Sequence, residues 1–313
     1  MKVAFLFPGQ GAQYIGMGKD FVGKFGVSKE IYERANEVLG YNIMQLCFEG
    51  PESELMKTKN TQPAILVTSV AILKVIEEAG VKCDITAGLS LGEYTALVKA
   101  KSLSFEDAIK VVKKRGEYMQ NTVPLGKGGM AAIIGLEKET VTEVISDLSR
   151  FGVIEIANYN SPDQLIISGG IDVVKQALKK LIELGAKRSV LLPVSAPFHC
   201  SLLKPAGERL GKELEKIKIE PPEIPVVNNI AVKIMKTKDD VLDSLVKQVS
   251  NSVYWQQTIE FMINDGVDTF IEIGPGNTLT KFNKKIAQNM DKKIRAYHVE
   301  NVEDFEFLLK DLS

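Results

Sequence analysis

The chain has 313 residues, of which 45% are apolar and 25% charged, proportions that are ordinary for a folded globular protein able to bury a core. Lys and Arg number 39 against 40 Asp and Glu, which gives a formal net charge of -1. This balance argues against a nucleic-acid-binding protein, which would need a basic excess to neutralise phosphates.

The N-terminal part of the sequence alternates apolar runs with helical patterns. Residues 3–7 form an apolar run that stops at Pro8-Gly9-Gln10-Gly11, which predicts a buried strand followed by a tight turn. Residues 21–46 have the pattern of a broken helix. Thr61-Gln62-Pro63 indicates the start of a further helix, with the proline in its first turn and an apolar run after it.

The alternation continues further along the chain. A short strand is predicted at residues 85–88, followed by helices at residues 94–101 and 104–120. Near the end, residues 269–273 form another apolar run that stops at Gly274-Pro275-Gly276. Strands that alternate with helices in this way predict an α/β fold with a mainly parallel sheet.

The middle of the chain has a different order of elements. Its patterns predict a strand, a helix, two strands, a helix and a strand at residues 130–136, 138–150, 153–158, 164–168, 172–184 and 188–194. The order β-α-β-β-α-β is that of a ferredoxin-like unit. We therefore expect a small inserted domain of residues 127–196, with Gly126 and Ser195 near its edges. Residues 1–126 and 197–313 then form the large catalytic domain.

Cysteine spacing and the length of the apolar runs indicate the cellular compartment of the protein. Cys47, Cys83 and Cys200 lie far apart without a C-x-x-C pair, which is typical of free thiols in a reducing cytoplasm. With only two histidines in the chain, we expect no metal site. The apolar run at residues 3–7 is too short for a signal peptide, and residues 64–76 include polar side chains. We therefore expect a cytoplasmic protein without a membrane span.

Gly88-Leu89-Ser90-Leu91-Gly92 has the G-x-S-x-G pattern of a nucleophile elbow. In such an elbow a serine lies on a strained strand-to-helix turn, and the flanking glycines are needed because neighbouring chains crowd it. The strand predicted before the turn and the helix predicted after it make Ser90 a candidate nucleophile. An ordinary glycine-bounded turn is the alternative for the pattern taken alone.

A nucleophilic serine needs a general base, because its own pKa lies far above neutrality. The chain offers only His199 and His298. In an ordinary α/β-hydrolase the histidine follows an acid late in the chain, which favours His298. His199 lies instead in a loop directly after the predicted small domain. Spacing alone leaves the choice between them open.

Taken together, six motifs resemble those of the stand-alone bacterial malonyl-CoA:acyl carrier protein transacylases. The resemblance covers nearly the whole chain, and the motifs are Pro8-Gly9-Gln10-Gly11-Ala12-Gln13, residues 88–93, Arg115-Gly116 with Met119-Gln120, Asn158-Tyr159-Asn160-Ser161-Pro162, Pro197-Phe198-His199 and Ile273-Gly274-Pro275-Gly276. This family has a hydrolase-like α/β domain with a ferredoxin-like insertion, which agrees with the elements predicted above.

The resemblance implies a role for each matching residue. Ser90 corresponds to the nucleophile, and His199 rather than His298 to the general base, which then acts as an acid toward the departing thiol. The family has no acidic third member, and a backbone carbonyl near the position of Gln248 holds the imidazole instead. The backbone N–H groups of Gln10 and Leu91 correspond to the oxyanion hole.

Arg115 is implied to bind the free carboxylate of the malonyl group, because a planar guanidinium can donate two parallel hydrogen bonds to it. Without the resemblance, Lys113-Lys114-Arg115 would be interpreted as a solvated basic stretch of helix. Phe198 is consistent with malonyl over methylmalonyl, since its ring would crowd an α-methyl group, with core packing as the alternative. The substrate-binding residues implied are Arg115, Gln248, Met119, Phe198 and Asn160.

One position departs from the family pattern. Family members usually have histidine directly before the nucleophile, where this chain has Leu89. The side chain at this position neighbours the site rather than taking part in proton transfer. We therefore expect a change in local polarity and no change in the chemistry.

The reaction implied by the resemblance is transfer of malonyl from malonyl-CoA to the phosphopantetheine thiol of acyl carrier protein, for fatty acid biosynthesis. It would proceed through a malonyl-serine ester with ping-pong kinetics and no permanently bound cofactor. The carrier protein is acidic as a class. The candidate docking charges form two clusters, Lys281, Lys284, Lys285, Lys292 and Lys293 in one and Lys179, Lys180, Lys187 and Arg188 in the other.

Three alternatives follow from the same residues. A serine esterase or thioesterase would use Ser90 with His298 and an acid such as Asp265 or Asp268. A non-catalytic scaffold that binds acyl carriers would form no acyl-enzyme. An acyltransferase of a polyketide pathway would share the chemistry, but the chain has no neighbouring synthase domain, which favours a stand-alone enzyme.

Overall fold

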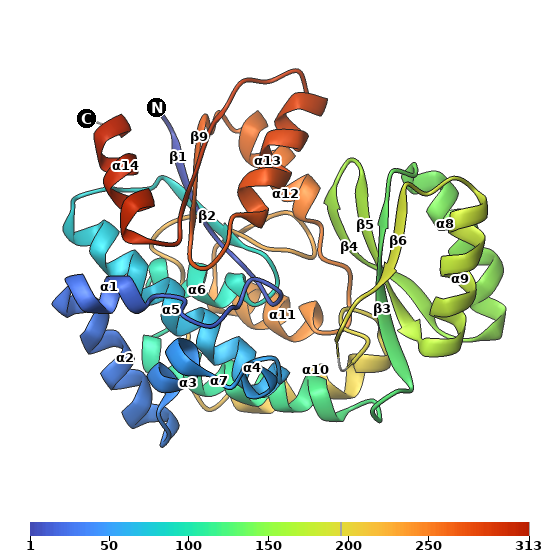
Figure 1. Ribbon diagram of the computed structural model, residues 1–313, viewed down its shortest axis with the longest axis horizontal. Coiled ribbons are helices and arrows are strands. Elements are labelled where there is room, and N and C mark those ends of the chain that lie inside the picture. The colour runs from blue at the N-terminus through green and yellow to red at the C-terminus, as the bar shows by residue number, and fades with distance from the viewer. Residues whose placement is uncertain (195, 313) are drawn as a thin grey trace.

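The computed structural model describes residues 1–194 and 196–312, which form two sheets that lie next to each other (Figure 1). Ser195, expected near an edge of the small domain, lies outside the described residues. The termini lie close together at one end of the larger part, where β1 begins and the last helix ends (Figure 1).

The larger sheet has six strands in the order β10-β9-β1-β2-β7-β8. In chain order these are β1 (Val3–Phe7), β2 (Ile85–Gly88), β7 (Val226–Val227), β8 (Ile234–Met235), β9 (Thr269–Ile273) and β10 (Arg295–Val299). Neighbouring strands pair parallel from β10 to β7, and β8 joins antiparallel at the edge. The predicted α/β fold with a mainly parallel sheet is confirmed.

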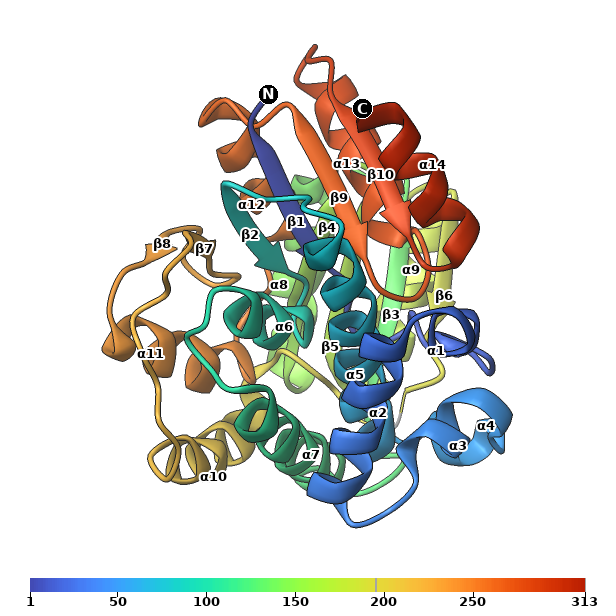
Figure 2. The ribbon, with the colours of Figure 1, turned by 90° about the vertical axis from the view of Figure 1, so that its left-hand side faces the viewer.

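Helices cover both faces of this sheet, because the central strands are apolar on both sides (Figure 2). Phe5 and Phe7 pack into the core with α5 and α6, whereas Ala4 and Leu6 face α12 and α13. The helices of this larger part are α1 (Lys19–Lys24), α2 (Gly26–Leu39), α3 (Ile43–Glu49), α4 (Glu52–Leu55), α5 (Thr58–Glu78), α6 (Gly92–Lys99), α7 (Phe105–Asn121), α10 (Lys204–Leu214), α11 (Lys238–Gln248), α12 (Trp255–Asn264), α13 (Thr278–Asn289) and α14 (Val302–Leu312), with the 3-10 helix η2 (Ser201–Leu203).

The start of α5 corrects the prediction made from Thr61-Gln62-Pro63. The helix begins at Thr58, so Pro63 lies inside it rather than in its first turn. The Lys57 carbonyl already accepts the N–H of Thr61, and the Thr61 hydroxyl donates to the carbonyl of Leu55. The contact with the end of α4 therefore starts the helix about one turn before the sequence signal.

The smaller sheet has four antiparallel strands in the order β4-β5-β3-β6, which is the arrangement of a ferredoxin-like unit. Its elements are β3 (Gly128–Ile134), α8 (Lys138–Leu148), η1 (Ser149–Phe151), β4 (Ile154–Ser161), β5 (Gln164–Gly170), α9 (Ile171–Glu183) and β6 (Arg188–Leu191). The inserted unit is thus as predicted, and its boundaries at residues 127 and 196 stay a prediction.

Successive side chains of β3 face opposite sides of the smaller sheet, and those on one side pack against the larger part. Met130 and Ala132 belong to the main core, whereas Ala131 and Ile133 face α8 and α9 on the other side (Figure 1). A backbone link adds to this contact, since the N–H of Tyr159 in β4 donates to the carbonyl of Val253. The inner face of the smaller sheet is therefore held against the larger part.

Cys47, Cys83 and Cys200 are free thiols, and the first and last are buried. None of the described helices combines the length and the apolar character needed to cross a lipid bilayer.

A substitution at Gly92, at the start of α6, tests how tightly the turn around Ser90 is packed. A Cβ at this position would lie 2.1 Å from the carbonyl oxygen of Phe7, whereas a Cβ at Gly23 in α1 would meet nothing within 4 Å. We predict that Gly92→Ala lowers the free energy of unfolding by about 1–3 kcal/mol. The control Gly23→Ala should leave it unchanged or raise it by up to about 1 kcal/mol. Equal stability of the two variants in urea denaturation would contradict this packing.

Candidate active site

Ser90 lies at the tip of the sharp turn between β2 and α6, with a φ of 52°. A Cβ at Gly88 would lie 1.9 Å from the carbonyl carbon of Gly92, so the two glycines of the motif allow a close backbone approach that no other residue permits. Positive φ is costly for a serine and is typical of functional turns. The turn therefore has the geometry of a nucleophile elbow.

His199 is the histidine that reaches the serine. Its Nε2 lies 2.8 Å from Ser90 Oγ, and its Nδ1 lies 2.7 Å from the backbone carbonyl oxygen of Gln248. A carbonyl oxygen only accepts, so Nδ1 carries the proton and Nε2 is left to accept the hydroxyl hydrogen of Ser90. Burial, together with the charge of Arg115, lowers the pKa of the imidazole to about 4. The ring is therefore neutral near pH 7 and able to take a proton.

Arg115 places a buried positive charge next to the nucleophile. The residue is 1% exposed, and its Nη2 donates to Ser90 Oγ over 3.1 Å. Its Nη1 and Nη2 also donate to the side-chain oxygens of Gln62 and Gln248, each over 2.9 Å. Burial lowers the pKa of the guanidinium, and all three hydrogen-bond partners are neutral. Its Nε has no hydrogen-bond partner among the described residues, and Arg115 lines the cavity over Ser90, so the guanidinium keeps donor capacity for an anion.

Gln10 and Leu91 contribute backbone N–H groups at the edge of the same site. Neither N–H donates a hydrogen bond to the described residues. The two loops touch, since a Cβ at Gly9 would lie 2.4 Å from the carbonyl oxygen of Leu89. Leu91 precedes α6, where the helix dipole favours negative charge. These N–H groups are suited to an oxyanion beside Ser90.

A cavity of about 430 Å³ opens over Ser90 and lies between the two sheets. One wall comes from the larger part and includes Met119 and Leu89, and the opposite wall comes from the smaller sheet and includes Asn160. Phe198 lines the cavity next to the base. The side-chain oxygen of Asn160 is buried and has no hydrogen-bond partner among the described residues. The cavity is mostly apolar, and Arg115 and His199 are the lining side chains that contact Ser90 Oγ.

Gln62, Glu93 and Asn229 belong to the site but received no role from the sequence. Asn229 Oδ1 accepts the backbone N–H of Ser90 over 2.6 Å, and its Nδ2 donates to the carbonyl of Gly88 over 2.9 Å. The N–H of Asn229 in turn donates to Glu93. Glu93 follows the serine motif directly, so its position was a usable signal. Gln62 lies in a segment whose pattern indicated only the start of a helix, and Asn229 lies in one without a distinguishing pattern.

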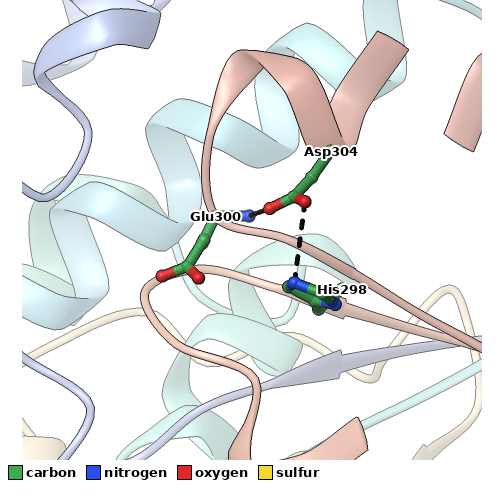
Figure 3. A group of neighbouring side chains, drawn as sticks. All are labelled: His298, Glu300 and Asp304. Atoms are coloured by element: carbon green, nitrogen blue, oxygen red, sulfur yellow. Dashed lines mark hydrogen bonds and ion pairs between the residues drawn. The ribbon is translucent and has the colours of Figure 1, made fainter. Parts of the chain in front are cut away.

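His298 lies outside the site that contains Ser90. It lies on β10, where its Nε2 is 3.6 Å from Asp304 Oδ1 and Glu300 is nearby (Figure 3). Asp265 and Asp268 are bound to Lys2 instead, through Nζ and the backbone N–H respectively. None of the three residues His298, Glu300 and Asp304 lines the cavity over Ser90. The arrangement expected for an ordinary hydrolase is therefore absent from the described residues.

His298, Glu300 and Asp304 are also the group with metal-ligand spacing, because their ligand atoms lie within 4.8 Å of one another. The group is partly exposed, and its histidine already pairs with Asp304. The expectation that the protein holds no metal stays a prediction.

Two of the candidate docking charges are engaged in ion pairs. Lys285 on α13 contacts Asp163 between β4 and β5, and Lys180 on α9 contacts Asp147 on α8, with N–O distances of 2.6 and 2.7 Å. These pairs are half-exposed, so a charged partner could still compete for either lysine.

Comparisons with known proteins agree over almost the whole chain. The family model described as an acyl transferase domain matches residues 4–306. A malonyl CoA-acyl carrier protein transacylase of Bacillus subtilis is 42% identical over 312 residues, which cover 99% of this chain and 97% of the relative.

Solved structures of such proteins have the same fold. The malonyl CoA-acyl carrier protein transacylase from Clostridium perfringens is 46% identical with a TM-score of 0.95, and the match covers 100% of this chain and 97% of that one. A malonyl-transacylase in complex with its type II PKS acyl-carrier protein is 40% identical with a TM-score of 0.96, and the match covers 99% and 100% of the two chains.

The low pKa of His199 predicts an acid-dependent loss of stability. The imidazole titrates near pH 4 when folded and near its ordinary 6.5 when unfolded, so the unfolded chain binds more protons between these values. Stability is therefore lost as the pH falls through this window. Between pH 7.5 and pH 4 we predict that the His199→Gln variant loses about 3 kcal/mol less than the wild type. Urea denaturation measures this, and His298→Gln is the control. Parallel losses in wild type and His199→Gln would contradict the assignment.

Proposed function

This chain belongs to the acyl transferase domain family, and from that premise we propose that it transfers malonyl from malonyl-CoA to the phosphopantetheine thiol of an acyl carrier protein. The observation that carries the proposal is the buried guanidinium of Arg115, 3.1 Å from Ser90 Oγ. A neutral acyl group would leave this charge without an anionic hydrogen-bond partner, whereas the malonyl carboxylate supplies one. The family likeness and the geometry of the site therefore support the same substrate.

The first half-reaction esterifies the serine. His199 Nε2 takes the hydroxyl proton while Ser90 Oγ attacks the thioester carbonyl of malonyl-CoA. The N–H groups of Gln10 and Leu91 stabilise the negative oxygen of the tetrahedral intermediate, a contribution of about 3 kcal/mol for such a donor. The intermediate collapses, the carbon–sulfur bond breaks, and His199 returns the proton to the sulfur of coenzyme A. The product is a malonyl ester on Ser90.

The second half-reaction repeats these steps with the carrier thiol. His199 takes the proton from the thiol, and the sulfur attacks the ester carbonyl. The same oxyanion site stabilises the intermediate, and the Ser90 oxygen leaves with the proton from His199. One base and one oxyanion site serve both steps, which gives ping-pong kinetics. The product would enter fatty acid biosynthesis.

The other residues that line the cavity are suited to bind a short acyl group with a carboxylate, attached to the pantetheine arm. Arg115 binds the malonyl carboxylate, and the side chain of Gln248 orients the guanidinium. Met119 and Phe198 close the apolar wall, so they limit branching next to the carboxylate. The buried, unpartnered side-chain oxygen of Asn160 supports a role as acceptor for an amide N–H of the pantetheine arm.

The covalent intermediate has a direct test. Native protein mixed with malonyl-CoA should gain the mass of one malonyl group in intact-mass spectrometry, and Ser90→Ala should gain none. His199→Ala should slow acylation by at least about 1000-fold, because the serine loses its base, whereas His298→Ala should acylate at the native rate. A silent His199→Ala with an inactive His298→Ala would indicate the hydrolase arrangement instead. An unmodified native protein would indicate a scaffold.

The charge of Arg115 has a separate test. We predict that Arg115→Ala lowers kcat/KM for malonyl-CoA by at least about 100-fold, because the carboxylate loses its charged partner. Acetyl-CoA has no carboxylate, so its slow acylation of Ser90 should change far less. Equal losses for the two donors, measured by rapid quench, would remove the carboxylate contact from the mechanism.

A further inference from the structure

We propose that Glu93 is a positioning residue whose ionised side chain holds the nucleophile, the base and the malonyl-binding arginine in place from beneath the turn. The inference rests on the proposed function for the reaction through which it is measured. Glu93 lies in the first turn of α6, three residues after Ser90, and is 0% exposed. It touches neither the cavity nor the reacting atoms, so its effect is exerted through its neighbours.

The surroundings of Glu93 are built for a carboxylate. Its Oε1 accepts the hydroxyl of Ser244 over 2.8 Å, and its Oε2 accepts the backbone N–H of Asn229 over 2.9 Å. Oε2 also accepts the side-chain Nε2 of Gln248 over 3.1 Å. All three partners are donors toward Glu93. A proton on Oε2 would point at two N–H groups, and a proton on Oε1 would require the Ser244 hydroxyl to turn away.

Two of these partners hold the reacting groups directly. Asn229 accepts the N–H of Ser90, which fixes the turn from below. Gln248 accepts Nδ1–H of His199 on its backbone carbonyl and accepts Nη2 of Arg115 on its side-chain oxygen. Its Nε2 also donates to the carbonyl of Ser90 over 3.1 Å. One carboxylate thus lies a single residue away from the nucleophile, the base and the arginine.

The pKa of the Glu93 carboxyl lies near neutrality. Burial raises the pKa of its carboxyl to about 7, although its three donors and Arg115 lower it. The titratable groups that interact with it are Arg115 from α7 and Tyr94 from α6. Of these only Arg115 is charged at pH 7. The donors therefore meet an anion above about pH 7 and a neutral acid below it.

The pH dependence of Ser90 reactivity follows from this network. In the wild type, the rate should rise as the pH passes about 7, because ionisation of Glu93 restores the bonds to Asn229 and Gln248. A second, lower inflection near pH 4 belongs to His199. In Glu93→Gln, an amide N–H₂ replaces one acceptor and faces a donor. The rate at pH 8 should fall about 10- to 100-fold, as for other partners that orient a reacting group, and the inflection near pH 7 should disappear.

The Ser244→Ala variant distinguishes an effect of the Glu93 charge from an effect of the packing of its side chain. It removes one donor to the carboxylate and leaves Asn229 and Gln248 in place, so the ionised form of Glu93 is less favoured. We expect the upper inflection to move to higher pH, with the same rate at the plateau. A purely structural role for Glu93 would leave the inflection where it is. This variant also decides the question if Glu93→Gln does not fold.

The experiment measures the rate at which Ser90 is modified between pH 3.5 and pH 9 in wild type, Glu93→Gln and Ser244→Ala, as a rough span around the two inflections. Two reagents are used, malonyl-CoA and a small phosphonofluoridate, which reacts with an activated serine without needing the arginine. The proposal predicts the inflection near pH 7 in wild type with both reagents, its loss in Glu93→Gln and its upward shift in Ser244→Ala.

Each contrary result has a distinct meaning. An unchanged profile and rate in Glu93→Gln, or an unmoved inflection in Ser244→Ala, would overturn the role of Glu93. A wild type that reacts with the phosphonofluoridate and shows the inflection, but is never acylated by malonyl-CoA, would overturn the proposed function and support the role of Glu93.

Discussion

The contact between the buried guanidinium of Arg115 and Ser90 Oγ is the interaction on which the rest of the site depends. A charge that is 1% exposed is costly to hold when its direct partners are two glutamine oxygens and a hydroxyl. The core around α5 and α7 must therefore stabilise a residue that the free protein satisfies only in part. An anionic acyl group relieves this cost at the moment it reaches the nucleophile. The favourable binding energy therefore comes from the malonyl group rather than from the pantetheine arm.

The histidine is held by a neutral group, which suits chemistry on a thioester. The carbonyl of Gln248 fixes the tautomer of His199 without adding a negative charge that would raise the pKa of the imidazole. The thiol that leaves in the first step and attacks in the second is far more acidic than an alcohol, so proton transfer to and from the sulfur needs only a weak base. The carboxylate of this site is Glu93, which lies on the far side of Gln248. Negative charge is thus kept one residue away from the base.

Local signals account for what the sequence predicted. The two glycines around Ser90 are required by contacts within a few residues and with β1, so they leave a short readable motif. Arg115 was ambiguous in Lys113-Lys114-Arg115, but it lies on the buried face of α7 with Val112 and Met119 at helical spacing, which a solvated arginine would not. Gln62, Asn229 and Gln248 come from distant segments and meet only in the folded chain. No local pattern marks them, and for Gln248 only the family resemblance did so.

The most direct measurement of the central claim compares malonyl-CoA with its uncharged amide analogue, malonamyl-CoA. The two donors have nearly the same size and the same thioester, and they differ in the charge presented to Arg115. We expect kcat/KM for acylation of Ser90 to favour malonyl-CoA by at least about 100-fold, the value of a charged partner for a buried guanidinium. Equal rates for the two donors would contradict the claim that this buried charge selects the acyl group.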